Sequence, residues 1–216
     1  MSTETGSWKT LEQSYGFFAK GLEYPDPEFW GGIEGKALGE LALLDDDAGY
    51  ANGAADECFP PRDQQDREVE YVSTFDGRSL QQYEGSCRPR VGRDGILEEV
   101  LRFYHHFGLK LNEARRDFPD NFITELEFMG HLLRLEAQAC ARGGDAASYA
   151  RAQRDFLARH VVLWAEALPE RMERMKLDNC YCLLAKWLRV FVRAHLEKLN
   201  ARVGASDPET VEGKPV

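Results

Sequence analysis

The stretch DFPDNFITELEFMGHLL, residues 117–133, carries the strongest helix signal in the sequence. Its apolar side chains recur at spacings of three and four, which places them on one face of an α-helix. The residues of this face are Phe122, Leu126, Met129 and Leu133, and Ile123, Phe128 and Leu132 widen it. A face this wide predicts a central helix that is buried on more than one side.

The residues before this face predict where the helix begins. Proline suits the first helical position because its missing N–H has no partner to lose there, so we expect Pro119 at that position. Asp120 would then complement the positive end of the helix dipole. Two interpretations stay open at this point: the sequence PDN is only a good helix start, or its polar groups also bind a ligand.

Working outward, apolar spacings of three and four dominate the chain, whereas strict alternation is almost absent. This pattern predicts an all-α fold, a single helical bundle. Asp94, Asp145 and Asp178 are expected to cap three of the helices. Helices are expected at about 8–21, 27–45, 64–75, 95–108, 119–142, 146–168 and 178–202.

The length and the composition favour one domain over residues 1–216. A segment rich in Gly, Pro and Asp, 52–66, predicts a flexible connection, and the tail 203–216 is expected to be disordered. The formal net charge of -10 argues against nucleic acid or an anionic membrane as a partner. No apolar run predicts membrane insertion and the first residues lack a signal peptide pattern, so we expect a cytoplasmic protein.

The histidines give little support to catalysis or metal binding. His105 and His106 are adjacent and point to different sides of a helix, while Glu127 and His131 share a face but form only one pair. No Glu-x-x-His motif occurs, so the di-iron pattern of helical bundles is missing. His160 lies on the apolar face of its helix and is interpreted as a core histidine.

The other motifs of enzymes are also missing. The five cysteines form no C-x-x-C pair, which favours reduced thiols. Phosphate-binding, dinucleotide-binding and hydrolase motifs do not occur. We therefore predict no catalytic residue, no metal ligand and no enzyme. Two alternatives to a binding protein with a defined ligand stay open: a helical adaptor or scaffold, and a metal-dependent helical enzyme with its site near His131 or His105.

Three blocks of sequence resemble the TorD/DmsD/NarJ family of redox enzyme maturation chaperones. YVSTFDGRSLQQYEG at 71–85 resembles the family's Tyr-x-x-x-Phe-x-Gly segment followed by Pro-Tyr-Glu. FPDNFITELEFM at 118–129 resembles its Pro-Asp-His helix start, and FLARHVVLWAEALPERM at 156–172 resembles its Phe-x-x-x-His-x-x-x-Trp helix. Gln82 and Asn121 depart from the family, which often has proline and usually histidine there; asparagine keeps the hydrogen bonding without the charge.

The resemblance implies an all-helical chaperone that binds the twin-arginine leader, or the apo catalytic subunit, of an exported molybdopterin oxidoreductase until its cofactor is inserted. Within the family, the sequence looks most similar to chaperones of ethylbenzene dehydrogenase, selenate reductase and chlorate reductase type enzymes. No cofactor of its own is implied, apart from the weak guanine nucleotide binding linked to some members. A monomer and a domain-swapped dimer both fit the family, and no residue decides between them.

The resemblance also implies which residues bind the leader. Because arginine binds carboxylates through two parallel hydrogen bonds, we expect Glu84, Asp120 and Glu125 to contact the leader arginines. Tyr71, Phe75 and Tyr83 would add apolar surface, with Phe75 also open to a plain core role, and Gly77 would shape a turn. The full set of leader-binding candidates is Tyr71, Phe75, Gly77, Tyr83, Glu84, Pro119, Asp120, Asn121 and Glu125.

A loop rich in glycine and arginine, 76–95, precedes the helix that is expected at 95–108. Its arginines either keep the loop soluble or contact an acidic patch of the client enzyme. These arginines are Arg78, Arg88, Arg90 and Arg93.

Overall fold

A computed structural model describes residues 2–36, 58–76, 80–88, 92–110 and 118–205. Within these ranges the chain is helical and has no strand, so the all-α prediction is confirmed. No helix in the described part of the chain is long and apolar enough to cross a membrane. The elements are α1 (Ser2–Leu22), α2 (Pro27–Ile33), α3 (Gln64–Tyr71), η3 (Val72–Asp76), α4 (Glu84–Cys87), α5 (Arg93–His106), α6 (Phe122–Ala141), α7 (Ala146–Phe156), η4 (Leu157–Val161), α8 (Val162–Arg174) and α9 (Cys180–Val203).

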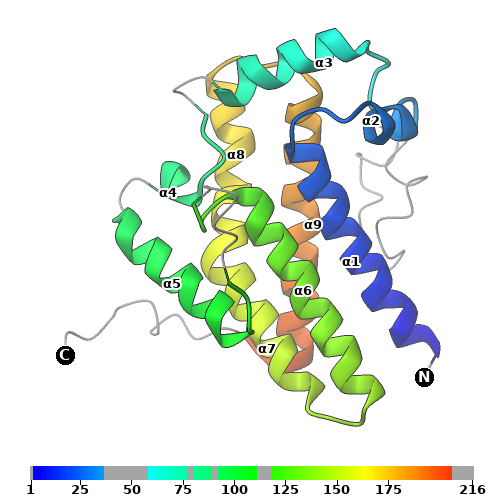
Figure 1. The fold of residues 1–216 in the computed structure, drawn as a ribbon, viewed down its shortest axis with the longest axis vertical. Coiled ribbons are helices and arrows are strands. Elements are labelled where there is room, and N and C mark those ends of the chain that lie inside the picture. Colours follow the sequence, from blue (N-terminus) through cyan, green and yellow to red (C-terminus); the bar gives the residue numbers. More distant parts are fainter. Residues whose placement is uncertain (1, 37–57, 77–79, 89–91, 111–117, 206–216) are drawn as a thin grey trace.

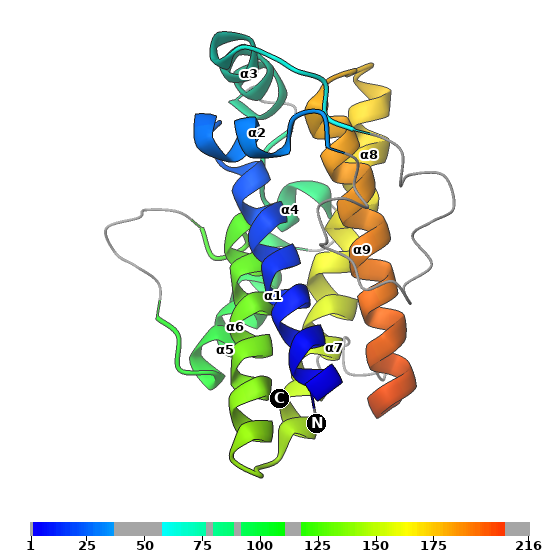
Figure 2. The same cartoon turned by 90° about the vertical axis from the view of Figure 1, so that its right-hand side faces the viewer.

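The long helices run roughly parallel to one axis, and α3 lies across one end of them (Figure 1). α1 and α6 lie side by side, with α8 and α9 behind them in this view. The view from the side shows α9 packed along α8 and α7 (Figure 2). Trp164 of α8 and Trp187 of α9 are buried in the hydrophobic core between these helices. The core thus joins helices that are distant in sequence.

α6 is the central helix that its sequence predicts. Phe122, Leu126, Met129 and Leu133 are all buried, as expected from their spacing. The start of the helix differs from the prediction, because α6 begins at Phe122 rather than at Pro119. Asn121 is the N-cap, and its side chain accepts a hydrogen bond from the Ile123 backbone N–H at 2.9 Å.

The helix expected at 146–168 extends further along the chain in the structure. A π-helical turn, which is wider than an α-helical turn, lies in its middle. α7, η4 and α8 follow one another from Ala146 to Arg174, and η4 is a π-helical turn. Asp145 caps α7 by accepting a hydrogen bond from the Ser148 N–H at 3.2 Å, which confirms the predicted cap. The π turn contains His160, which is fully buried as the core interpretation requires.

Two predicted caps are wrong. α5 begins at Arg93 after Gly92, so Asp94 lies inside the first turn, where it still complements the helix dipole. At α9 the cap is Asn179 rather than Asp178, and its side chain accepts a hydrogen bond from the Tyr181 N–H at 3.1 Å. Asn179 takes the extended backbone conformation that a cap needs, whereas Gly92 has no side chain that could cap α5.

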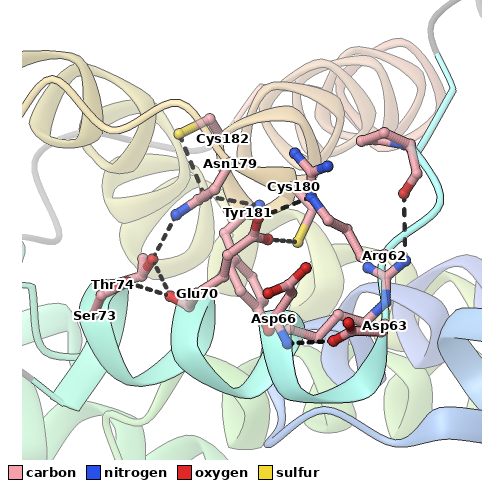
Figure 3. Close-up of polar contacts among 12 residues, drawn as sticks. Arg62, Asp63, Asp66, Glu70, Ser73, Thr74, Asn179, Cys180, Tyr181 and Cys182 are labelled. Carbon is pink, nitrogen blue, oxygen red and sulfur yellow. Dashed lines mark hydrogen bonds and ion pairs between the residues drawn. The ribbon is translucent and has the colours of Figure 1, made fainter.

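Polar side chains attach α3 and η3 to the start of α9 (Figure 3). The Asn179 amide donates to the Thr74 hydroxyl at 2.8 Å, and the Cys180 thiol donates to the Glu70 carboxylate at 3.2 Å. The other oxygen of Glu70 accepts from Arg62 at 3.2 Å. These contacts fix α3 over the end of the bundle, next to the C-terminal end of α1.

Several boundaries of the N-terminal half also differ from the predictions. α1 begins at residue 2 rather than 8. α2 ends at Ile33, within the expected helix 27–45. Most of the rest of that range lies outside the described residues. Of the expected connection 52–66, residues 52–57 also lie outside them, and α3 begins at Gln64 as predicted. The expected loop 76–95 contains the short helix α4, which the sequence did not predict. Most of the tail 203–216 is not described either.

Candidate functional site

The structure brings together two of the sequence blocks that are more than thirty residues apart. Tyr83 and Asn121 form an isolated antiparallel bridge. On one side of it the Glu84 N–H donates to the Asp120 carbonyl at 2.8 Å, and on the other the Phe122 N–H donates to the Gln82 carbonyl at 3.0 Å. The backbone around the bridge therefore holds the side chains of both blocks in one place.

Asp120 belongs to this junction and is fully buried. One oxygen of its carboxylate accepts from the Gly85 backbone N–H at 3.0 Å, at the start of α4. The other lies 3.3 Å from the guanidinium of Arg93. Both oxygens thus have partners within the chain, and those partners hold α4 and α5 against the start of α6.

Glu84 is also fully buried, and it connects this junction to the π turn. Its Oε2 lies 2.8 Å from Nδ1 of His160, and its Oε1 is paired with Arg88. Arg88 in turn donates to the carbonyl of Arg159 at 3.0 Å. A buried carboxylate needs such partners because an unpaired charge in the interior is costly.

Glu125 is the third fully buried carboxyl group of this region. Its Oε2 accepts a hydrogen bond from the indole Nε1 of Trp164 at 2.7 Å. Burial raises the pKa of Glu125 well above its ordinary value, and the negative charge of Glu84 raises it further. A raised pKa disfavours the charged form of Glu125, which weakens this side chain as a partner for a cationic ligand.

Glu84, Asp120 and Glu125, which we expect from the family resemblance to contact the arginines of a leader, all lie in the interior. The structure pairs two of them with arginines of the same chain, Arg88 and Arg93. In this structure the three acids therefore make contacts within the interior.

The remaining candidates separate into two groups. Phe75 is buried against Tyr181, with ring centroids 5.0 Å apart, and Pro119 is buried and accepts a hydrogen bond from Tyr104 at 2.9 Å. Tyr71, Tyr83 and Asn121 instead line a groove on the surface. Gly77 lies outside the described residues, as do Arg78 and Arg90 of the arginine-rich loop.

This groove runs along the solvent side of α6 and has a volume of about 1270 Å³. α1 lines it with Glu23, Gly16 and Glu12, and α6 lines it from Asn121 to Arg134. The two helices are antiparallel here, because Gln82 beside the start of α6 donates to the Leu22 carbonyl at 2.7 Å, whereas Arg134 pairs with Glu12 at 2.8 Å. At 1.5 Å per helical residue, the groove between these two points is about 15 to 18 Å long.

Aromatic rings gather at the end of the groove near α3, and we call this part the aromatic end; it consists of Glu23, Tyr24, Tyr71, Tyr83 and Phe118. The rings of Tyr24 and Tyr71 pack edge to face with centroids 5.4 Å apart, and those of Tyr83 and Phe118 do so at 5.7 Å. Tyr24 and Phe118 are about half exposed, at 55% and 49%. Exposed aromatic side chains in a groove are typical of peptide-binding surfaces.

The aromatic end already holds one guanidinium group. Arg93 lies over the ring of Phe118 at 4.1 Å and over that of Tyr83 at 5.2 Å. Glu68 of α3 lies close enough to Tyr24 to raise the pKa of its phenol, after the effect of partial burial. Aromatic faces and carboxylates together form a suitable environment for further arginine side chains.

Sequence reasoning missed the α1 side of the groove. Glu12, Gly16 and Glu23 carry no recognisable motif, and their position beside α6 depends on the packing of α1. For Phe118 the sequence did contain an indication of exposure. This aromatic residue precedes Pro119 at the helix start and falls outside the apolar face of that helix. Tyr24 gave no such signal.

No three His, Cys, Asp or Glu side chains in the described ranges gather in a way that could hold a metal ion. The thiol of Cys180 is hydrogen-bonded to Glu70, and burial raises its pKa. A raised pKa keeps a thiol protonated and poorly nucleophilic at pH 7.

Comparison with known proteins identifies the family of the chain. The family model described as nitrate reductase delta subunit matches residues 41–170, more than half of the chain. The chain belongs to the nitrate reductase delta subunit family. The match includes the junction at Tyr83 and Asn121 and the π turn, whereas α1 and α9 lie outside it. The family resemblance inferred from the three sequence blocks is thus confirmed.

Several named relatives match nearly the whole chain. It is 34% identical to the chlorate reductase assembly chaperone protein of Ideonella dechloratans, over 93% of this chain and 95% of that one. It is 35% identical to the selenate reductase assembly chaperone protein of Thauera selenatis, over 94% and 95%. It is 30% identical to the perchlorate reductase assembly chaperone protein of Dechloromonas aromatica, over 88% and 91%. No solved structure matches significantly.

Proposed function

We propose that this protein is an assembly chaperone for the catalytic subunit of a molybdopterin oxidoreductase, and that it binds the twin-arginine leader of that subunit. The first part follows from its family and from its relatives, which are named as assembly chaperones of chlorate, selenate and perchlorate reductases. The second part rests on the groove between α1 and α6. Because a leader is present only before export, the proposed place of action is the cytoplasm.

The groove is the observation that carries the proposal. Its volume of about 1270 Å³ exceeds the roughly 300 to 1,000 Å³ that is typical of sites for small molecules. Its length of about 15 to 18 Å accommodates about 10 to 12 residues of helical peptide, or about five residues of extended peptide. An open groove of this size, with apolar surface from Leu109, Phe118 and Ile123, suits the apolar segment of a leader.

The aromatic end supplies what the two arginines of a leader need. Two acids lie near the ring pair of Tyr24 and Tyr71: Glu23, whose carboxylate pairs with Lys20 at 2.9 Å, and Glu68, which lies beside Tyr24. A leader guanidinium that replaces Lys20 at Glu23 can bind this carboxylate and stack on a ring at once. Arg93 shows the same combination within the chain, with Asp120 as its carboxylate and Phe118 as its ring. In this assignment the arginine-binding acids are Glu23 and Glu68, in place of the three buried carboxyl groups.

Binding of this kind is expected to be reversible. A peptide that folds on binding loses about 2 to 5 kcal/mol to ordering. A dissociation constant near 1 μM, which corresponds to about -8 kcal/mol, leaves the client able to depart once it is mature.

Isothermal titration calorimetry with a synthetic twin-arginine leader tests the proposal. We expect saturable binding, and a loss of at least about tenfold in affinity when both arginines are replaced by alanine. The double variant Glu23→Gln/Glu68→Gln should lose a similar amount, whereas Glu170→Gln/Glu173→Gln, which changes two exposed acids of α8, should bind normally. Equal affinity for both peptides would contradict the proposed arginine recognition.

A further inference from the structure

The two ends of the groove differ in charge. The end opposite the aromatic one, which we call the basic end, consists of Lys110, His131 and Arg134. Lys110 and Arg134 both line this end, and Arg134 pairs with Glu12 at 2.8 Å. Glu23 lies at the other end, where it pairs with Lys20 at 2.9 Å, and Arg93 there pairs with the buried Asp120. Glu127 lies between the two ends.

The position of the basic end follows from contacts on both sides of the groove. Arg134 is four residues beyond Gly130, where an added Cβ would lie 3.9 Å from Cγ of Glu12. His131 Nε2 lies 3.3 Å from the carbonyl of Phe107, which is three residues before Lys110. The segment after α5 and the second half of α6 therefore form this end together.

We infer that the groove fixes the direction of the bound client segment: its basic N-terminal part lies at the aromatic end, and a carboxylate downstream of its apolar part binds at Lys110 and Arg134. The inference rests on the proposed function and adds to it a second point of recognition. The charges of the two ends are complementary to a segment with arginines first and an acid later.

A helical client segment would strengthen this preference. The C-terminal end of a helix carries partial negative charge on its free carbonyl groups, and cations near it are favourable. In the inferred direction that end faces Lys110, His131 and Arg134, while the arginines stay near Glu23. The reverse direction would place the arginines of the segment against the cations of the basic end.

The length of the groove then sets the number of residues between the arginine pair of the client segment and its acid. About 15 to 18 Å of helix corresponds to about 10 to 12 residues between the arginine pair and the acid. Clients whose acid falls at this distance should bind more tightly than clients whose acid falls elsewhere. The basic end would thus discriminate between leaders that all contain two arginines.

Photo-crosslinking tests the direction. Two synthetic twin-arginine peptides carry a benzophenone at the N-terminal or the C-terminal end, and mass spectrometry locates the adducts on the full-length protein. We expect N-terminal adducts near Tyr24 and Phe118 and C-terminal adducts near His131 and Arg134. The opposite pattern, or adducts of both peptides at both ends, overturns the inference.

A charge exchange tests the carboxylate site. A peptide with Asp about 11 residues after the arginines is compared with the same peptide carrying Asn, by calorimetry. We expect the Asp peptide to bind about 2- to 5-fold more tightly, and the variant Lys110→Gln/Arg134→Gln to abolish this difference. The control variant Lys9→Gln/Lys186→Gln, which changes two exposed lysines outside the groove, should retain it.

The outcomes separate this inference from the proposed function. Arginine-dependent binding with no preference for Asp overturns the basic-end site and leaves leader binding intact. Absence of saturable binding by either peptide overturns leader binding itself, and the inferred direction with it.

Discussion

Nδ1 of His160 lies 2.8 Å from Oε2 of Glu84, and the two residues are 76 positions apart in the sequence. Both are fully buried. The contact joins the start of α4 to the π turn between α7 and α8, so it connects two of the three sequence blocks that identify the family. Glu84 and His160 are therefore part of the framework that shapes the groove, at a distance from its surface.

Replacing Glu84 by alanine should destabilise the fold by about 3 to 5 kcal/mol, because Arg88 and His160 would lose the carboxylate between them in the interior. Urea unfolding measures this loss. The matched variant Glu98→Ala removes an exposed acid of α5 and should change the stability by less than about 0.5 kcal/mol. If the Glu84→Ala protein has unchanged stability but fails to bind a leader, Glu84 contacts the leader directly, and the structural role assigned to it is wrong.

Asp120→Ala should also act on stability. It removes the acceptor of the Gly85 N–H and the partner of Arg93, and we expect a loss of about 1 to 3 kcal/mol. Asp120→Asn keeps one acceptor oxygen and should lose less. The check is thermal or urea unfolding of both variants beside the wild type, and equal stability of all three would contradict the role assigned to Asp120.

Glu125→Gln should change how stability depends on pH. The pKa of Glu125 is raised in the fold, so the folded state keeps its proton while the unfolded state releases it above about pH 4.5. Stability is therefore lost as pH rises from 4.5 toward the folded pKa, by roughly 1.4 kcal/mol per pH unit from this group. Glutamine does not titrate, so the variant should gain stability relative to wild type as pH rises above about 4.5. A difference that stays constant as pH rises would contradict a raised pKa of Glu125.

Much of this interior was predictable from the sequence, because apolar periodicity depends only on local spacing. The spacing of Phe122, Leu126, Met129 and Leu133 fixes the buried face of α6, and that of Phe156, His160 and Trp164 places the histidine in the core. The exact helix starts were less predictable. Adjacent residues such as Asp178 and Asn179 can both cap, and the backbone conformation decides which one does.

The binding surface could not be obtained in the same way. Acids beside a motif look like ligands for arginine, but burial decides whether they face solvent, and burial of Glu84 and Asp120 depends on the partners Arg88 and Arg93. The groove needs α1 beside α6, a contact between segments about 120 residues apart such as Glu12 and Arg134. No local pattern encodes it.

His195 gives a second pH dependence, of opposite sign. Burial lowers its pKa to about 3, and the hydroxyl of Tyr15 lies 2.7 Å from its Nδ1. The unfolded state takes up a proton below about pH 6.5 while the folded state does not, so stability falls as pH falls from 6.5 to 3. In urea unfolding at several pH values, His195→Gln should show a shallower decline than wild type. His105→Gln, at an exposed position, should follow wild type, and a His195→Gln profile parallel to wild type would contradict a neutral buried histidine.

The central claim is that a client segment occupies the groove between α1 and α6, and Gly16 offers the most direct test. Gly16 lines the groove on α1 and is exposed, and a Cβ added there would meet no other atom within 4 Å. Leucine at this position fills the groove and favours the helix by up to about 1 kcal/mol. The control Gln13→Leu places the same side chain on an exposed position of α1 outside the groove.

The measurement is calorimetric titration of both variants and the wild type with a twin-arginine leader, together with their melting temperatures. We predict that Gly16→Leu melts at the same temperature as wild type or higher and binds at least about tenfold more weakly, while Gln13→Leu binds normally. A stable Gly16→Leu protein that binds the leader with wild-type affinity would contradict the assignment of the groove.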